Sequence, residues 1–225
     1  MLELTLYHCV SARSFRALWA LEELGLDYKL VLMEFPPRLQ NKKFLEINPL
    51  GTVPALVDFD EVLTESAAIC EYLSQKYGSA CLSVNKSEPD YGQYLNWLSA
   101  GEATLTFPQT LILRYGHFEP ESRRLNQVVE DYTRWFLSRL RGVENALQRG
   151  DNFLCQNRFS NADIVVGYAL MLANFLGLAD QFQPLTAAYW QRIQEQKSFA
   201  RALSAENCAA QSQGVNALPS PLLRP

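Results

Sequence analysis

The fold is decided by the stretch NPLGTVPALVD, residues 48–58, and by TESAAI, residues 64–69, which follows it closely. Pro54 stands at the mouth of an apolar run typical of a β-strand, where a proline cannot donate to the strand ladder. A cis Val53–Pro54 bond solves this problem, because X-Pro bonds cost only about 0.5–1 kcal/mol in cis and permit a sharp turn into a strand. The turn predicts that the backbone N–H and C=O of Val53 point outward, where they can pair with an extended peptide.

Glu65 and Ser66 stand just before residues 67–77, which have the pattern of a helix. A carboxylate at this place can hold an ammonium group, while the helix N-terminus favours a carboxylate. Together the two segments predict a site for a peptide that has a free amino-acid head and a backbone able to pair with Val53. Each segment alone also has an ordinary interpretation, with residues 48–51 as a turn and Ser66 as a helix N-cap.

The composition is that of a globular protein with one large or two small domains: 225 residues, 48% of them apolar and 20% charged. The net charge is −4 and the basic residues are scattered, which argues against a nucleic-acid surface. The sequence contains no run of about 18 apolar residues, so we expect no membrane span. The N-terminus has neither a basic nor an apolar signal region, so we expect no secretory signal.

The cysteine pattern favours free thiols in a reducing compartment, and we therefore predict a cytoplasmic protein. The five cysteines are dispersed and form no CxxC pair: Cys9, Cys70, Cys81, Cys155 and Cys208. With only two histidines in the chain, we expect no metal site.

The first 78 residues alternate between strand and helix patterns. Period-two runs at residues 2–8 and 27–35 flank a helical pattern at residues 14–24 that Gly25 ends, which predicts a parallel strand pair with a right-handed crossover. Further elements are expected at residues 42–47 (helix), 55–59 and 62–64 (a hairpin) and 67–77 (helix). The order βαβ, α, ββα resembles an α/β thioredoxin-like domain, which we place at residues 1–78.

Beyond a polar linker at residues 79–90, every strong pattern is helical, and we predict an all-α domain over residues 91–204. Helices are expected at residues 93–114, with a kink at Pro108, and at 122–147, 164–178 and 185–203. The segment 164–178 is apolar nearly all round, so it should be a buried central helix. Residues 205–225 mix Ser, Gln, Asn and three prolines and predict a flexible tail.

The central helix begins with Ser160-Asn161-Ala162-Asp163, which has the pattern of a capping box. Serine at the N-cap and an acid three residues later satisfy each other's backbone N–H groups, and such a cap is worth about 1 kcal/mol. We therefore predict a structural role for Asp163.

In their order and spacing, residues 48–58 and 64–66 resemble the glutathione site of the cytosolic glutathione transferase family. The box at residues 160–163, preceded by Phe153-Leu154 and Phe159, resembles the folding box of this family's second domain, so the resemblance covers roughly residues 2–200. It implies a Ser-type, bacterial-like glutathione S-transferase: a cytoplasmic homodimer active in detoxification, with glutathione as co-substrate and a small electrophile or hydroperoxide as second substrate. The alternative is a non-catalytic glutathione-binding or protein-interaction module on the same fold.

The resemblance implies that Ser11 activates the glutathione thiol, because the serine of Ser-type members lies five residues before an arginine, here Arg16. Ser14, Tyr7, Cys9 and activation without any side chain stay open as alternatives. Ser14 is expected to cap the first helix with its hydroxyl, and Tyr7, the position used by Tyr-type members, is expected to lie in the core. Cys9 does not match the cysteine position of Cys-type relatives, and we expect a buried, inert thiol.

The resemblance also assigns the residues that bind glutathione. Val53 would pair with its backbone, and Glu65 and Ser66 would hold its amino-acid head. The glycine end needs a donor from the loop at residues 36–43, where Arg38, Gln40 and Lys42 are available. Of these we choose Gln40, and the other two stay open.

Overall fold

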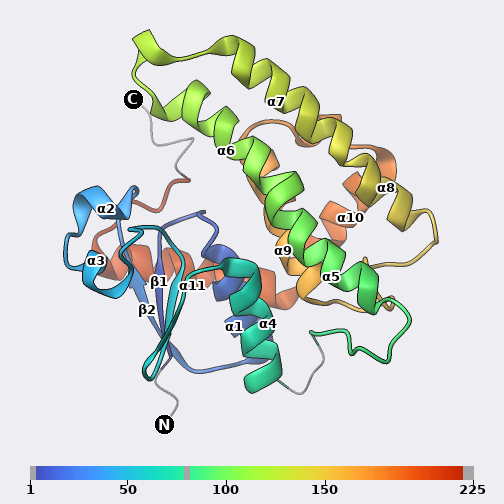
Figure 1. The fold of residues 1–225 in the computed structure, drawn as a ribbon, viewed down its shortest axis with the longest axis horizontal. Coiled ribbons are helices and arrows are strands. Elements are labelled where there is room, and N and C mark those ends of the chain that lie inside the picture. The colour runs from blue at the N-terminus through green and yellow to red at the C-terminus, as the bar shows by residue number, and fades with distance from the viewer. Residues whose placement is uncertain (1–3, 79–81, 220–225) are drawn as a thin grey trace. The chain divides into compact units, whose positions relative to one another are not determined.

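The structure is a computed structural model that describes residues 4–78 and 82–219 (Figure 1). The described residues divide into two compact units. Unit 1 is drawn from residues 1–83 and 194–225, and unit 2 from residues 84–193. Unit 1 therefore combines the beginning of the chain with its C-terminal part.

Unit 1 contains a mixed sheet with the strand order β2-β1-β3-β4. The strands are β1 (Leu4–His8), β2 (Tyr28–Leu32), β3 (Ala55–Asp58) and β4 (Glu61–Leu63). β1 pairs in parallel with β2 and antiparallel with β3, which forms the expected hairpin with β4. This order confirms the thioredoxin-like fold class; Leu2 and Glu3 of the predicted first strand lie outside the described residues.

Three helices of unit 1 begin and end within a few residues of the predicted positions: α1 (Phe15–Leu24), α3 (Phe44–Ile47) and α4 (Ser66–Lys76). α2 (Pro37–Gln40) lies in the segment expected to be a loop, and α11 (Lys197–Gln213) ends ten residues beyond the helix expected at residues 185–203. Gly25 ends α1 in the left-handed conformation (φ 62°), as a C-terminal glycine is expected to do. α1 and α4 pack against each other, and their apolar faces bury Trp19, Ile69 and Leu73.

Helix α11 corrects the predicted C-terminus. We expected a flexible tail from residue 205, but the helix continues to Gln213, and it belongs to unit 1 instead of the helical domain predicted to reach residue 204. Figure 1 shows α11, in red, beside α1. Of the predicted linker, residues 79–81 lie outside the described residues, while Leu82 and Val84 are buried.

Polar side chains at both ends of α11 fasten it to unit 1. Near its start, the Trp19 indole N–H donates to Ser198 Oγ (2.9 Å). At its end, the Gln213 amide bonds the open edge of β2: Oε1 accepts from the N–H of Leu32 (2.9 Å) and Nε2 donates to the C=O of Leu30 (2.9 Å). These partners of Ser198 and Gln213 are more than 170 residues away in the sequence, so the local pattern does not show them.

Unit 2 is helical throughout. Its α-helices are α5 (Tyr91–Ala100), α6 (Phe107–Leu113), α7 (Asn126–Arg139), α8 (Arg141–Leu147), α9 (Asn161–Phe175) and α10 (Pro184–Gln194). The shorter segments are the π-helical η1 (Gly101–Thr106) and η2 (Arg114–Phe118) and the 3₁₀ turns η3 (Glu121–Arg123) and η4 (Ala179–Gln181). Within the described residues, no helix combines the length and the apolar character needed to cross a membrane.

The predicted helix at residues 93–114 is interrupted by η1, immediately before Pro108. A wider helical turn accommodates the backbone where proline cannot donate. Gly101 starts this turn against α9, and a Cβ atom at Gly101 would lie 2.5 Å from Val165. Close packing on the central helix therefore needs a glycine at this position.

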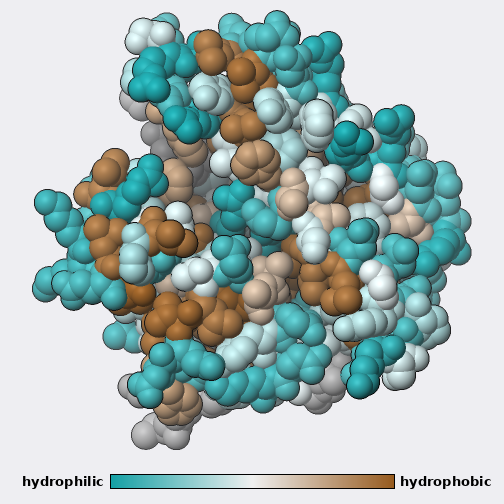
Figure 2. Space-filling view, viewed as in Figure 1, coloured by the Kyte–Doolittle hydropathy of each residue, from teal (hydrophilic) through white to brown (hydrophobic). Residues whose placement is uncertain are grey.

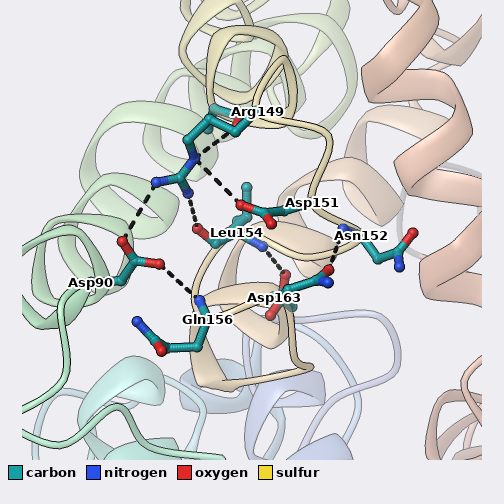
Figure 3. Close-up of polar contacts among 9 residues, drawn as sticks. Asp90, Arg149, Asp151, Asn152, Leu154, Gln156 and Asp163 are labelled. Atoms are coloured by element: carbon teal, nitrogen blue, oxygen red, sulfur yellow. Dashed lines mark hydrogen bonds and ion pairs between the residues drawn. The ribbon is translucent and has the colours of Figure 1, made fainter.

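The start of α9 is held by the predicted capping box and by further bonds to Asp163, of which Figure 3 shows the one from Leu154. Asp163 accepts the N–H of Ser160 (2.9 Å), the N–H of Leu154 (3.0 Å) and the hydroxyl of Tyr189 (2.8 Å). Burial raises the pKa of Asp163 to about 6, although these donors favour the carboxylate. Asp163 thus fastens both the preceding loop and α10 to the central helix.

Beside this network, Arg149 bridges two segments of unit 2 (Figure 3). Its guanidinium lies 3.5 Å from Asp90 and from Asp151 and donates to the C=O of Leu154 (3.1 Å). Asp90 in turn accepts the N–H of Gln156 (2.9 Å). The loop between α8 and α9 is therefore held by two hydrogen bonds, one at Leu154 from Arg149 and one at Gln156 to Asp90.

Asp163→Ala tests the structural role. The substitution leaves four buried donors without this acceptor, the N–H groups of Leu154 and Ser160 and the hydroxyls of Ser160 and Tyr189, each at a cost of about 1–3 kcal/mol, so we expect the free energy of unfolding to fall by at least about 4 kcal/mol. Chemical denaturation followed by circular dichroism measures this change.

Asp131→Ala is the matched control, because Asp131 pairs with Arg134 on the exposed face of α7. An exposed ion pair is worth about 0–1 kcal/mol, so the denaturation midpoint should move little. Equal losses in the two variants would contradict the role given to Asp163.

Candidate functional site

The turn before β3 is built around Asn48, whose side chain is buried. Its Nδ2 donates to the C=O of Thr52 (2.7 Å), and its Oδ1 accepts the N–H of Leu50 (3.1 Å). Gly51 adopts φ 61° against α2, where a Cβ atom would lie 2.6 Å from that of Arg38. The turn thus has one fixed shape, and only glycine fits at its tightest point.

Val53 follows this turn, and the Val53–Pro54 bond is cis, as predicted. The Val53 side chain packs on a buried cluster formed by Cys9, Met33, Phe44 and Ala55. Among the described residues, neither the N–H nor the C=O of Val53 hydrogen-bonds another residue. Its backbone therefore has the capacity to pair with an extended ligand, and pairing itself stays a prediction.

The surface around this turn is partly apolar. Figure 2 shows apolar surface on the side of α2 and α3. The large exposed apolar side chains of this region are Phe35, Leu39, Leu45 and Leu50. Exposed apolar surface that gathers in one place is typical of binding regions.

Glu65 and Ser66 lie at the start of α4, as predicted, but with different local roles. Glu65, and not Ser66, is the N-cap residue: its backbone is extended and its C=O accepts the N–H of Ile69 (2.8 Å), while its side chain is exposed. Ser66 is the first helical residue and is buried, and its hydroxyl accepts a hydrogen bond from Nη1 of Arg16 (3.0 Å). The hydroxyl caps no helix N–H because a guanidinium holds it.

Arg16 is fully buried although it is charged. The sequence analysis used it only to locate Ser11. In the structure it places a guanidinium under the start of α4, beside the hydroxyl of Ser66. A buried cation next to a helix N-terminus favours an anion there, so Arg16 belongs with the residues predicted to hold a carboxylate head.

Ser11 lies in the loop between β1 and α1 and is 8% exposed. Its backbone is left-handed (φ 57°), a conformation that is uncommon for residues other than glycine. Its N–H donates to Oε1 of Glu206, on α11 (2.8 Å). The backbone strain and the buried carboxylate distinguish Ser11 from the other residues of its loop.

Ser14 does not cap α1 with its hydroxyl, contrary to the prediction. Its Oγ lies 2.6 Å from Nδ1 of His8 and accepts the N–H of Cys9 (3.4 Å). His8 uses its other nitrogen to donate to Oε1 of Glu206 (2.7 Å). Ser14 is thus engaged by a buried imidazole, and that engagement replaces the expected cap.

Of the remaining candidates for thiol activation, Tyr7 is half-buried and Cys9 is fully buried. Tyr7 packs on Phe44, with ring centroids 5.4 Å apart. Cys9 is fully buried, and burial together with the charge of Glu34 raises the pKa of its thiol to about 12. A thiol with that pKa is not a nucleophile at neutral pH, which agrees with the expectation of an inert Cys9.

The structure does not single out a residue for the glycine end of glutathione. Arg38, Gln40 and Lys42 are all exposed on and after α2. Arg38 lies against the turn through its contact with Gly51. Gln40 stays a prediction. No group of three or more metal-ligating side chains occurs within residues 4–78 and 82–219.

Sequence reasoning missed His8 and Glu206, and it used Arg16 only for spacing. A buried Arg16 could have been suspected, because the helical pattern of residues 14–24 places it beside apolar residues. Glu206 left no such signal, since its partners lie at the other end of the chain.

Comparisons with known proteins agree with this geometry. Residues 2–75 match the family model described as "Glutathione S-transferase, N-terminal domain". The chain is 31% identical to Glutathione S-transferase 2 of Schizosaccharomyces pombe over 175 residues, which cover 73% of each chain. It is also similar to two solved structures. A glutathione transferase from Methylococcus capsulatus has a TM-score of 0.80 at 26% identity and covers 91% of this chain and 99% of its own.

The second structure is a sphingomonad glutathione S-transferase complexed with glutathione, with a TM-score of 0.77 at 26% identity over 90% of this chain and 98% of the other. The match of the N-terminal domain, the identity over most of both chains and the shared fold lead to one conclusion: the chain belongs to the glutathione S-transferase family.

Proposed function

We propose that the chain is a glutathione transferase in which unit 1 binds glutathione and the Ser11 hydroxyl stabilises its thiolate. Val53 pairs with the peptide backbone, while Glu65 and Ser66, with Arg16 beneath them, hold the amino-acid head. The thiolate then attacks a small electrophile or a hydroperoxide. The alternative of a non-catalytic module is not favoured, because the Schizosaccharomyces pombe relative and the Methylococcus capsulatus structure are both named as glutathione transferases.

The left-handed backbone of Ser11 in the loop before α1 supports its role, and the contacts of the other candidates are consistent with it. Ser14 is bonded to His8, Tyr7 packs on Phe44, and the Cys9 thiol has its pKa raised to about 12. Ser11 alone combines a hydroxyl with a strained backbone directly before α1. Strained residues of this kind cluster at functional sites, which supports the assignment.

One hydroxyl is sufficient for the chemistry. A thiol with a pKa near 8.5 is only about 3% thiolate at neutral pH, and lowering the pKa by about two units takes about 2.7 kcal/mol. A hydrogen bond from a hydroxyl to an anion contributes about 1.5–3 kcal/mol, and the N-terminus of a helix about 0.3–1 kcal/mol. Ser11 and the start of α1 together supply this amount. The thiol proton leaves to solvent, so no protein base is needed.

Two further properties follow from the family and are proposed with it. We propose a cytoplasmic protein, which the free thiols of Cys9, Cys70, Cys155 and Cys208, the cysteines within the described residues, support, and a role in detoxification. We also propose a homodimer. Light scattering tests the dimer directly, because one chain has a mass of 25.5 kDa and the particle should have twice that mass.

Glu65→Ala tests the binding of the amino-acid head. Loss of the carboxylate leaves the ammonium group of glutathione without its charged partner, and we expect the dissociation constant to rise more than about tenfold, or about 1.4 kcal/mol. Isothermal titration calorimetry with glutathione measures it. Glu71→Ala, six residues further along α4, is the control and should bind as the unchanged protein does. Equal affinities in all three proteins would remove Glu65 from the site.

Ser11→Ala tests thiol activation. Without the hydroxyl, the pKa of bound glutathione should rise by about one to two units, while its affinity changes little because most contacts lie elsewhere. Turnover at neutral pH should fall roughly ten- to a hundredfold and recover as the pH rises, because solvent then deprotonates the thiol unaided.

The ultraviolet absorbance of the bound thiolate gives its titration curve in both proteins, and an electrophile assay gives turnover. Superimposable titration curves would clear Ser11 of this role. Tyr7→Phe would then be the next variant to titrate.

A further inference from the structure

A carboxylate from the last helix holds the backbone of the candidate thiol-activating residue. The Ser11 N–H donates to Oε1 of Glu206 at 2.8 Å. Glu206 is 3% exposed, and the two residues are separated by 195 positions in the sequence. Since Ser11 is left-handed (φ 57°), its backbone needs a fixed partner to stay in that conformation.

The same oxygen of Glu206 is oriented by His8. The His8 Nε2–H donates to Oε1 at 2.7 Å, while Nδ1 lies 2.6 Å from the hydroxyl of Ser14. His8 and Ser14 are fully buried. Glu206 therefore receives two donors in a dry environment, where hydrogen bonds are strong and a misplaced carboxylate would be costly.

Contacts on both sides of Glu206 fix the position of α11. Eight residues before it, Ser198 accepts the indole N–H of Trp19. Seven residues after it, Gln213 bonds the edge of β2 through two hydrogen bonds. A helix rises about 1.5 Å per residue, so each anchor lies only about 10–12 Å from Glu206 along α11. The carboxylate is thus presented to Ser11 from a rigid support.

We infer that Glu206 is a positioning residue for catalysis: it holds Ser11 in the geometry that directs its hydroxyl at the glutathione sulfur, and α11 is a working part of the thiol-activating site. The inference rests on the proposed role of Ser11. Glu206 acts through the backbone of Ser11. The property that matters is its reach, by which we mean the length of side chain that brings the carboxylate oxygen to the Ser11 N–H.

The reach of Glu206 and its negative charge have opposite expected effects on the pKa of the bound glutathione thiol. If reach matters, moving the acceptor away from the Ser11 N–H misplaces the hydroxyl and raises the thiol pKa. If only the negative charge of Glu206 mattered, removing it would lower the thiol pKa, because a nearby anion disfavours a thiolate. Two conservative variants separate these effects.

Glu206→Asp keeps the charge but withdraws the acceptor by one carbon–carbon bond, about 1.5 Å, which breaks a 2.8 Å hydrogen bond. We expect the pKa of bound glutathione to rise by about half a unit to one unit, with turnover at neutral pH three- to tenfold lower. Glu206→Gln keeps the reach of an acceptor oxygen without the charge, and its thiol pKa should be no higher than that of the unchanged protein.

The measurements are the ultraviolet titration of bound glutathione, its affinity by calorimetry and the thermal melting of each variant. A thiol pKa in folded Glu206→Asp at or below that of the unchanged protein overturns the inference. Arg149→Ala is the matched control, because it removes contacts within unit 2 and touches neither α11 nor Ser11. It should lower the melting temperature and leave the thiol pKa unchanged; a pKa rise equal to that of Glu206→Asp would show a merely structural effect.

A double variant separates this inference from the proposed function. In a Ser11→Ala background, Glu206→Asp should raise the thiol pKa no further, because the hydroxyl it positions is absent. An additive rise overturns the inference and leaves the role of Ser11 intact. If Ser11→Ala alone does not change the thiol pKa, the proposed role of Ser11 fails, and the inference fails with it.

Discussion

The hydrogen bond between the Ser11 N–H and Glu206 joins the first part of unit 1, the loop after β1, to its last helix, α11. A buried carboxylate is tolerated only when donors surround it, and the donors here come from β1 and the loop that follows it. The first and last segments of unit 1 therefore depend on each other. If α11 detached from unit 1, the buried donors of His8 and Ser11 would lose their acceptor, and the loop that contains Ser11 would lose the bond that holds its conformation.

Arg16 gives the site its second fixed point. It lies in α1, directly after the Ser11 loop, and its guanidinium holds the Ser66 hydroxyl at the start of α4. One short stretch of chain, residues 11–16, thus reaches both places where the proposed ligand is held: the thiol end through Ser11 and the amino-acid head through Ser66. Because α1 is packed against α4 and α11, the separation of these two places is set by the core.

Most of unit 1 and the capping box of α9 were predictable because their causes are local. The turn at residues 48–54, the hairpin and the Ser160–Asp163 pair each contain both partners within a few residues. α11 was only partly predicted, for the opposite reason. Its buried positions follow helical spacing but are mostly small or polar: Ser198, Phe199, Ala202, Glu206 and Ala210. Such a stripe lacks the apolar contrast that indicates a helix, and its partners lie in β1, β2 and α1.

The conformation of Ser11 links this long-range packing to chemistry. A left-handed backbone costs a residue with a Cβ atom about 1–2 kcal/mol, and glycine would adopt it without that cost. A hydrogen bond to a carboxylate is worth about 1.5–3 kcal/mol, so Glu206 offsets the strain. It would hold a glycine at this position equally well, since it bonds only the backbone N–H. The hydrogen bond to Glu206 therefore does not by itself require a serine here, and the proposed function assigns the Ser11 hydroxyl to the glutathione thiol.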